Sequence, residues 1–210
     1  YELEWFRGFS SIISILNQVI KPEFYFSYIK EEQIKNEINK SSIGVKLRWN
    51  HKEEFISGKF NRISIGSYYP VLELKYEMGI KDVLLSDFAY NKLSFKLLHD
   101  FSVSPFGRLY LTFSSGINFD DVPYLLNYNP KANDTYYHNY RTFNNMNPYE
   151  FSFKEYVELH IYQHFQGKVL DYVPLFRKLK WRSVLSVKAI SGNSPSSTYG
   201  GNLKNISWDK

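Results

Sequence analysis

The chain of 210 residues carries a formal net charge of +5, and 19% of its residues are aromatic. It contains no cysteine, which excludes disulfides and thiolate metal sites. Its Lys and Arg residues are spread through turns and alternate strand positions rather than gathered in a patch, so we do not expect a nucleic-acid partner. No stretch approaches the ~20 consecutive apolar residues of a membrane-spanning helix.

The two ends of the sequence look like interior positions of a longer protein. Tyr1 lies at the start of an alternating segment. The sequence around it has no Met, no charged region and no apolar stretch of the kinds that form a signal sequence. The last residues, from Ile206 to Lys210, resemble a strand that is cut short. We therefore expect residues 1–210 to be one part of a larger domain.

Alternation of apolar and polar residues with period two is the main signal, and it predicts β-strands. It is clearest in residues 42–50 and 72–80. The apolar set there is Ile43, Val45, Leu47, Trp49, Leu72, Leu74, Tyr76 and Met78, and the charged set is Lys46, Arg48, Glu73, Lys75 and Glu77. Charged residues at every second position suit a water-filled lumen, so we expect the charged set to face the lumen and the apolar set to face lipid.

Less regular alternation follows in several other segments, namely residues 23–28, 92–101, 108–119, 157–165 and 179–189. Most of the runs have about 9–13 residues, near the ~9–11 that a tilted strand needs to cross a bilayer. Strands of globular proteins average only about 5–6 residues. The sequence therefore predicts an all-β fold, a transmembrane antiparallel up-and-down β-barrel of which about eight to nine strands are visible. Residues 1–210 are then expected to be part of a single outer-membrane β-barrel domain.

The connections come in two sizes. Ser102 to Gly107 is a tight turn that contains Pro and Gly, whereas residues 119–151 and 191–205 are long and rich in turn-forming residues. Short turns on one side and long loops on the other are typical of outer-membrane barrels. Residues 169–178 leave room for a short helical turn.

The most distinctive segment is Phe143-Asn144-Asn145-Met146-Asn147-Pro148-Tyr149-Glu150-Phe151. It resembles a motif of a large Bacteroidetes-type outer-membrane family of unassigned function. The family's His-x-x-x-His-Phe-x-Gly element is matched by His160, His164, Phe165 and Gly167, and its basic Pro-Leu stretch by residues 173–182. Further matches are Tyr69-Pro70-Val71, Tyr76, Gly79-Ile80-Lys81 and Pro105-Phe106-Gly107.

This resemblance implies a protein of the cell outer membrane. Full-length members of the family join an N-terminal carboxypeptidase-like regulatory domain, a small β-sandwich without peptidase activity, to a C-terminal transmembrane barrel. The resemblance implies no settled function and no cofactor.

His160 and His164 have the spacing that places two imidazoles side by side on a helix, as in many metal sites. Their surroundings alternate as a strand, and four residues along a strand span about 13 Å. That separation is too large for two ligands of one Zn²⁺ at about 2 Å each. We therefore assign Glu158, His160, Tyr162 and His164 to a polar ladder that faces the lumen, and we expect no metal or cofactor.

The loop of residues 119–151 is unusually aromatic, with Tyr124, Tyr128, Tyr136, Tyr137, Tyr140, Phe143 and Tyr149. A long loop without secondary structure is either functional or disordered, and this aromatic content argues against disorder. We predict an ordered loop that folds over the barrel mouth or against a partner. The residues expected to anchor its return into the next strand are Phe143, Asn144, Met146, Asn147, Tyr149, Glu150 and Phe151.

No Ser/His/Asp arrangement, phosphate-binding Gly loop or paired carboxylate stands out, so the sequence does not predict an enzyme. The first hypothesis is a structural or assembly subunit that docks other outer-membrane proteins and contacts outer-membrane lipid and lipopolysaccharide. The alternative is a pore or export conduit for a solute, which the charged lumen-facing positions favour.

Overall fold

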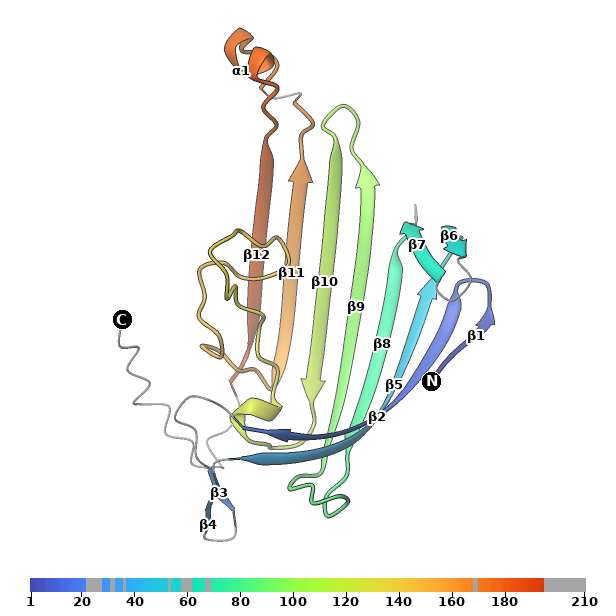
Figure 1. Cartoon of the computed structure of the whole chain (residues 1–210), viewed down its shortest axis with the longest axis vertical. Coiled ribbons are helices and arrows are strands. Elements are labelled where there is room, and N and C mark those ends of the chain that lie inside the picture. The colour runs from blue at the N-terminus through green and yellow to red at the C-terminus, as the bar shows by residue number, and fades with distance from the viewer. Residues whose placement is uncertain are drawn as a thin grey trace.

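The computed structural model describes residues 1–21, 28–30, 33–35, 37–52, 54–57, 62–66, 69–167 and 170–194. The fold is all-β, and its main feature is one sheet of eight antiparallel strands (Figure 1). In spatial order these are β1 (Glu2–Phe6), β2 (Phe9–Ile20), β5 (Ile38–Asn50), β8 (Val71–Gly79), β9 (Tyr90–Ser102), β10 (Arg108–Asn118), β11 (Glu155–His164) and β12 (Val184–Asn193). Neighbours in the sheet follow one another along the chain, which confirms the predicted up-and-down topology. The sheet is open, as expected of part of a barrel.

The connections between the long strands contain short secondary-structure elements. Two hairpins, β3–β4 (Tyr28–Lys30, Gln33–Lys35) and β6–β7 (Glu54–Ser57, Arg62–Gly66), lie between β2 and β5 and between β5 and β8. A single 3-10 turn, η1 (Tyr124–Leu126), opens the long loop after β10. The helical turn expected in residues 169–178 is confirmed as α1 (Pro174–Leu179). In the described part of the chain, no helix is long and apolar enough to cross a membrane.

Strand pairing sorts the alternating residues onto two faces of the sheet. Ile43 pairs with Met78, Val45 with Tyr76, Leu47 with Leu74 and Trp49 with Leu72, so the predicted apolar set shares one side, the apolar face. The opposite side, the polar face, carries the whole charged set, with Arg48 opposite Glu73. Following the pairs through β9 and β10 to β11 puts Glu158, His160, Tyr162 and His164 on the polar face as well.

The two faces are built of transverse rows that cross several strands. One polar row runs Arg48–Glu73–Lys96–Ser114–Glu158, and the adjacent apolar row runs Trp49–Leu72–Leu97–Phe113–Leu159. Directly opposed side chains on one face stabilise antiparallel pairs, which favours opposite charges in the first row and apolar contacts in the second. A slip of one residue in any strand would exchange the two faces, so this pattern specifies the register.

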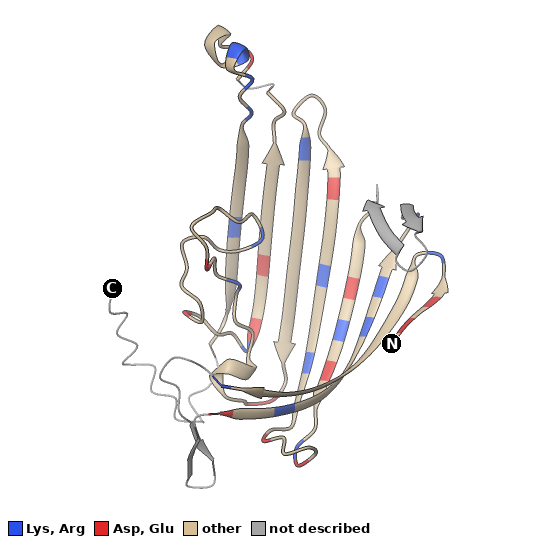
Figure 2. Cartoon of the chain, viewed as in Figure 1, with Lys and Arg blue, Asp and Glu red and all other residues tan. Residues whose placement is uncertain are grey.

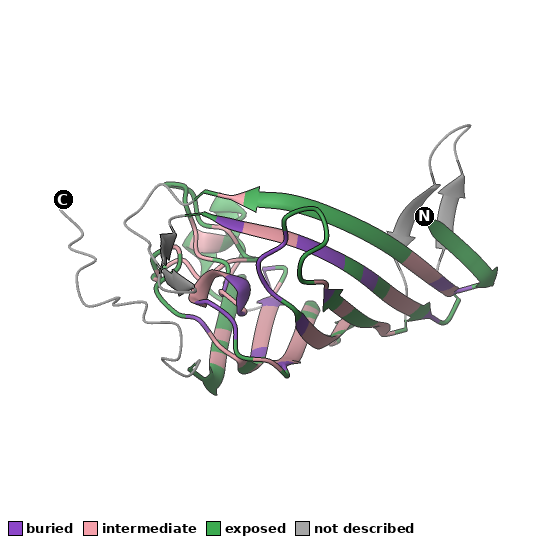
Figure 3. Cartoon of the chain, turned by 90° about the horizontal axis from the view of Figure 1, so that it is seen from below, coloured by how far each residue is buried: buried purple, intermediate pink, exposed green. Residues whose placement is uncertain are grey.

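The long loop after β10 lies on the polar face, and the sheet curves round it (Figure 1, Figure 3). We call residues 119–154 the inner loop. Its Val122 and Leu126 form the buried core with Ile38 of β5, Tyr90 of β9 and Phe88, which lies just before β9. The apolar core of the described residues is therefore small and sits on the inner side. Many large apolar side chains of the other face stay exposed, among them Ile15, Ile43, Leu74, Met78 and Val187.

The tight turn before β10 depends on glycine. Gly107 has φ of +91°, and a Cβ there would lie 2.0 Å from the carbonyl oxygen of His164. Both features exclude other residues, because L side chains avoid this backbone region and the space is filled by backbone. The turn confirms the assignment of Ser102–Gly107 between two long strands.

The distribution of connections differs from the expected one. The tight turns β1–β2 and β9–β10 lie at one end of the antiparallel sheet, but that end also carries residues 51–70 and 165–183. The opposite end carries the inner loop and residues 80–89. Short and long connections are therefore not strictly separated, because the β6–β7 hairpin and α1 are inserted at the tight-turn end.

Two strand predictions need correction. Residues 179–183 are not part of the last strand, because Leu179 ends α1 and Lys180 takes a left-handed conformation at φ of 52°. Strand β2 was not predicted, because Ile12 and Leu16 place apolar side chains on the polar face and break the alternation. The strand expected at 23–28, nearly all of the Gly/Ser-rich loop at 191–205 and the final segment Ile206–Lys210 fall largely or wholly outside the described residues.

Candidate functional site

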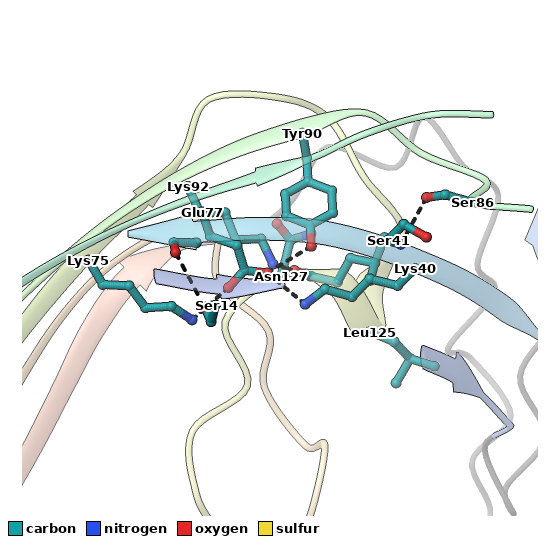
Figure 4. A network of polar contacts seen from close by, with 12 residues as sticks. Ser14, Lys40, Ser41, Lys75, Glu77, Ser86, Tyr90, Lys92, Leu125 and Asn127 are labelled. Carbon is teal, nitrogen blue, oxygen red and sulfur yellow. Dashed lines mark hydrogen bonds and ion pairs between the residues drawn. The ribbon is translucent and has the colours of Figure 1, made fainter. Parts of the chain in front are cut away.

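A cluster of three lysines surrounds one carboxylate on the polar face. Lys40 Nζ and Lys75 Nζ each lie 2.7 Å from a carboxylate oxygen of Glu77, and Tyr90 donates a hydrogen bond of 2.8 Å to the same group. Figure 4 shows these side chains, with Lys92 beside them, converging between β5, β8 and β9. Glu77 is thus the central acceptor that allows like-charged lysines to share this part of the sheet.

Tyr90 packs into a space that its strand neighbour leaves open. Gly79 is the residue paired with Tyr90 across β8 and β9, and a Cβ at Gly79 would lie 2.2 Å from the tyrosine ring. The ring in turn lies under two ammonium groups, with Lys92 Nζ at 4.6 Å and Lys40 Nζ at 5.5 Å from its centroid. These cation–π contacts stabilise the lysines while Glu77 neutralises part of their charge.

The rest of the predicted charged set forms a second group, centred on Glu73. Lys46 Nζ lies 3.0 Å and Arg48 Nε 3.8 Å from the Glu73 carboxylate. Lys46 and Lys75 are directly opposed in the β5–β8 pair, an unfavourable arrangement of like charges. Lys46 pairs diagonally with Glu73 of β8, and Lys75 pairs with Glu77 two residues along its own strand, which offsets that repulsion. Figure 2 shows how the charges gather on these strands.

Tyr128 of the inner loop makes two contacts with β11. The Tyr128 ring stacks on Tyr156, with centroids 3.5 Å apart and planes at 8°, and its hydroxyl donates to the buried Glu158 carboxylate. Burial, helped by the negative charge of Glu158, raises the pKa of Tyr128 above its ordinary value. The phenol therefore stays protonated and remains a donor at neutral pH.

Two lysines fasten the loop at other points. Lys188 of β12 donates to the carbonyl oxygens of Asn139, at 3.0 Å, and Thr142, at 2.5 Å. Lys92 of β9 donates to the carbonyl oxygen of Leu126 in η1. Hydrogen bonds from charged donors are stronger than neutral ones, so these ammonium groups hold the loop backbone at two separate places.

Aromatic contacts join the loop to the predicted polar ladder on β11. Phe143 meets the His160 ring edge-on, with centroids 5.0 Å apart, and Tyr140 lies 5.7 Å from the Tyr162 ring. His160 Nε2 also lies 2.5 Å from a Glu158 carboxylate oxygen. Residues 158–162 therefore form the floor on which the inner loop rests. His164 lies further along and meets the rings of Tyr110 and Tyr162.

The predicted anchor motif mainly holds the loop to itself. Asn144 Oδ1 accepts hydrogen bonds from Asn133 Nδ2, at 2.9 Å, and from the Asn139 backbone N–H, at 3.0 Å. Asn144 Nδ2 donates back to the Asn139 carbonyl oxygen at 3.1 Å. Phe143 continues this pattern through backbone hydrogen bonds with Lys131 and Asn133. Asn144 therefore closes the loop on itself, while the Phe143 ring contacts β11.

The end of the motif forms a turn before β11. Asn147 donates its backbone N–H to the Glu150 carboxylate at 2.8 Å, and the Tyr149 carbonyl oxygen accepts from the Tyr124 hydroxyl at 2.6 Å. Burial, with the nearby Glu150 charge, raises the pKa of Tyr124 to about 12. Phe151 stacks on Phe153, with centroids 6.2 Å apart, and Met146 is half-buried.

A cavity of about 250 Å³ remains between the inner loop and the polar face. Among its lining residues are Lys75, Lys92, Asn127, Lys154 and Tyr156. The cations around it already have partners, since Lys154 pairs with Asp121 at 2.6 Å and Lys75 pairs with Glu77. The inner loop thus covers β10–β12 closely and leaves a small polar space toward β8 and β9.

The histidines and loop carboxylates make separate contacts. His160 and His164 lie on β11 with different neighbours, and no group of three His, Asp or Glu residues in the described ranges could hold a metal ion. The carboxylate of Asp120, at the start of the inner loop, accepts hydrogen bonds from the backbone and side chain of Asn91.

Four contact residues were not singled out as site residues in the sequence: Tyr90, Lys92, Tyr128 and Lys188. Alternation places Lys92 and Lys188 on the polar face, but it does not say what they contact. Their partners are backbone carbonyl groups of a loop, and such pairs leave no signal in side-chain patterns.

Comparison with known proteins is consistent with the expected family of unassigned function. Neither a search of curated proteins nor a search of solved structures finds a match. Residues 25–199 match the C-terminal domain of a family of unknown function, DUF5686. That match covers most of the 210 residues, and the chain therefore belongs to the DUF5686 family, within its C-terminal domain.

Proposed function

We propose that this chain is part of a transmembrane β-barrel of a Gram-negative outer membrane and acts as a non-enzymatic structural or assembly subunit. Its partners are other outer-membrane proteins, outer-membrane lipid and lipopolysaccharide. The resemblance to Bacteroidetes-type proteins supports this location and suggests that a carboxypeptidase-like regulatory domain accompanies the barrel in the whole protein.

The two faces of the sheet support a position in the membrane. Large apolar side chains that stay exposed on the apolar face include Ile13, Ile15, Val45, Tyr76, Val157 and Leu185. Soluble proteins rarely leave a continuous apolar surface of this kind uncovered. The charged residues lie on the other face, where a water-filled interior would solvate them.

The docking of the inner loop on the polar face is the observation that favours a structural role over an open pore. It is docked on the polar face by Lys92, Tyr128 and Lys188, and it contributes Val122 and Leu126 to the buried core. In a closed barrel this segment would occupy the lumen. A barrel filled in this way suits the binding of partners better than free diffusion of a solute.

The second candidate is a pore or export conduit that opens when the inner loop moves. The charged groups around Glu73 and Glu77 favour it, since they line the part of the polar face next to the remaining cavity. This candidate requires the loop to leave its docked position.

Conductance across planar bilayers distinguishes the two candidates. We expect the intact protein to conduct little, and a variant with residues 129–147 replaced by a short Gly/Ser linker to conduct more. Large, steady conductance of the intact protein would contradict the structural proposal. Purification in mild detergent is the complementary test, and we expect other outer-membrane proteins to co-purify with the intact protein.

A further inference from the structure

The segment that joins β11 to β12 presents apolar side chains that no other described part of the chain covers. It extends beyond the strand ends, with α1 at its tip (Figure 1). Tyr172 is 88% exposed and Leu175 62% exposed. Trp181 folds back onto Phe176, with ring centroids 5.3 Å apart and planes at 15°. The segment therefore has a defined shape although its apolar groups face outward.

Residues 172–182, which we call the α1 segment, have an apolar side and a basic side. At 3.6 residues per turn, Leu175, Phe176 and Leu179 share one side of α1, and Arg177 and Lys178 lie on the other. Lys180 and Arg182 follow directly. Within the described residues no carboxylate pairs with these cations, and Asp171 is the nearest acidic residue in the sequence.

The α1 segment leads along the chain into the apolar face of the sheet. β12 begins three residues after Trp181, and Leu185, which pairs with Gln163 on the apolar face, is exposed. Trp181 is itself 55% exposed. Exposed apolar residues thus follow one another from α1 through Trp181 to Leu185, and the four cations are interspersed among them.

We propose that the α1 segment anchors the barrel in the membrane interface, with its apolar side among the acyl chains and its four cations on phospholipid phosphate groups. This inference rests on the membrane location proposed above. An amphipathic segment with Trp and Leu on one side and Lys or Arg on the other is suited to that depth. Basic side chains gain from anionic head groups there.

The two shortest connections assign the leaflet, although two long connections share their end of the sheet. The α1 segment lies at the same end of the sheet as the tight turns β1–β2 and β9–β10. Tight turns of outer-membrane barrels face the periplasm. The head groups bound by Arg177, Lys178, Lys180 and Arg182 are therefore those of periplasmic-leaflet phospholipid rather than lipopolysaccharide.

Site-directed spin labelling tests this anchor, and the absence of cysteine allows single labels. The protein is reconstituted in vesicles of phosphatidylethanolamine and phosphatidylglycerol with a nitroxide at Leu179→Cys or Lys178→Cys. Oxygen concentrates in the acyl region, whereas a nickel chelate stays in water. We expect the label at 179 to meet oxygen and be shielded from nickel, and the label at 178 to show the reverse.

A label at Leu74→Cys, on the apolar face of β8, reports separately on the barrel. If the label at 74 meets oxygen while the label at 179 meets nickel, the proposed interface anchor is wrong and the membrane location stands. If 74 also meets nickel, the proposed location fails and the anchor with it. Replacing the four cations by Gln, or omitting phosphatidylglycerol, should lower oxygen access at 179. Shielding of 179 only after lipopolysaccharide is added would overturn the assignment to phospholipid.

Discussion

The Tyr128 ring lies flat on Tyr156, with centroids 3.5 Å apart, and its hydroxyl donates to Glu158, the next polar-face residue of β11. One loop residue thus meets two successive positions on one face of the same strand. The residues expected to line a lumen therefore serve first as the docking surface of the inner loop.

Lys188→Met should loosen the inner loop, because it removes the ammonium donor to Asn139 and Thr142. Hydrogen bonds to charged groups contribute about 1.5–3 kcal/mol, and the two carbonyl groups would lose theirs. We expect faster proteolysis between Tyr124 and Tyr140 in native membranes. Lys81→Met, at an exposed position outside the loop, is the control and should leave the cleavage rate unchanged. Rapid cleavage of the unmodified protein without loss of partners would show that the loop is free.

Asn144→Ala should destabilise the closed form of the inner loop, whereas Asn145→Ala should not. Asn144 makes three hydrogen bonds with Asn133 and Asn139, and its neighbour Asn145 is exposed. At about 1 kcal/mol for each hydrogen bond, we expect a loss of about 1–3 kcal/mol in local stability. Hydrogen exchange of the loop amides measures this difference, and equal exchange in the two variants would refute the role of Asn144.

High pH should release the inner loop through Tyr128. Its pKa is raised in the folded state, so the stabilisation from the neutral phenol is complete below the unfolded value of about 10 and is lost as pH rises toward the folded value. We expect proteolysis of the loop to increase above about pH 10. Tyr128→Phe keeps the stacked ring and removes the titrating group, so its response to alkali should be smaller. An identical response would assign the effect to other groups.

Leu74→Arg should destabilise the protein in lipid far more than Lys75→Gln. If Leu74 lies near the bilayer midplane, an arginine there costs about 2–4 kcal/mol, because lipid cannot solvate the charge. Lys75 is on the polar face, and its partner Glu77 keeps Lys40 and Tyr90 when Lys75 is replaced. Equal effects on the free energy of unfolding in vesicles would argue for a soluble fold.

Alternation predicted most of the sheet, because each strand has one apolar and one polar side. It failed at β2, where Ile12, Leu16 and Ile20 lie on the polar face. Ile20 packs against the core that the inner loop completes. An apolar residue on the polar face can be explained only when the segment that covers it is known, and local sequence does not contain that information.

The candidate site was predicted as a set of positions and not as a set of contacts. The register of β5 and β8 puts Lys46, Glu73, Lys75 and Glu77 on one face, as the alternation of their strands predicted. The anchor motif was expected to secure the return of the loop, but its most connected residue, Asn144, binds residues earlier in the same loop. Hydrogen bonds within irregular backbone follow no periodic pattern, so the sequence alone does not predict them.

The place of the inner loop also constrains the order in which the barrel can be assembled. The loop joins β10 to β11 and is held from the concave side by β9, β11 and β12. Inserting it through the mouth of a finished barrel would require its aromatic side chains to cross a lumen lined with charges. Strands β9–β12 with their seated loop are therefore the natural first unit, and the remaining wall would close last around an interior that is already filled.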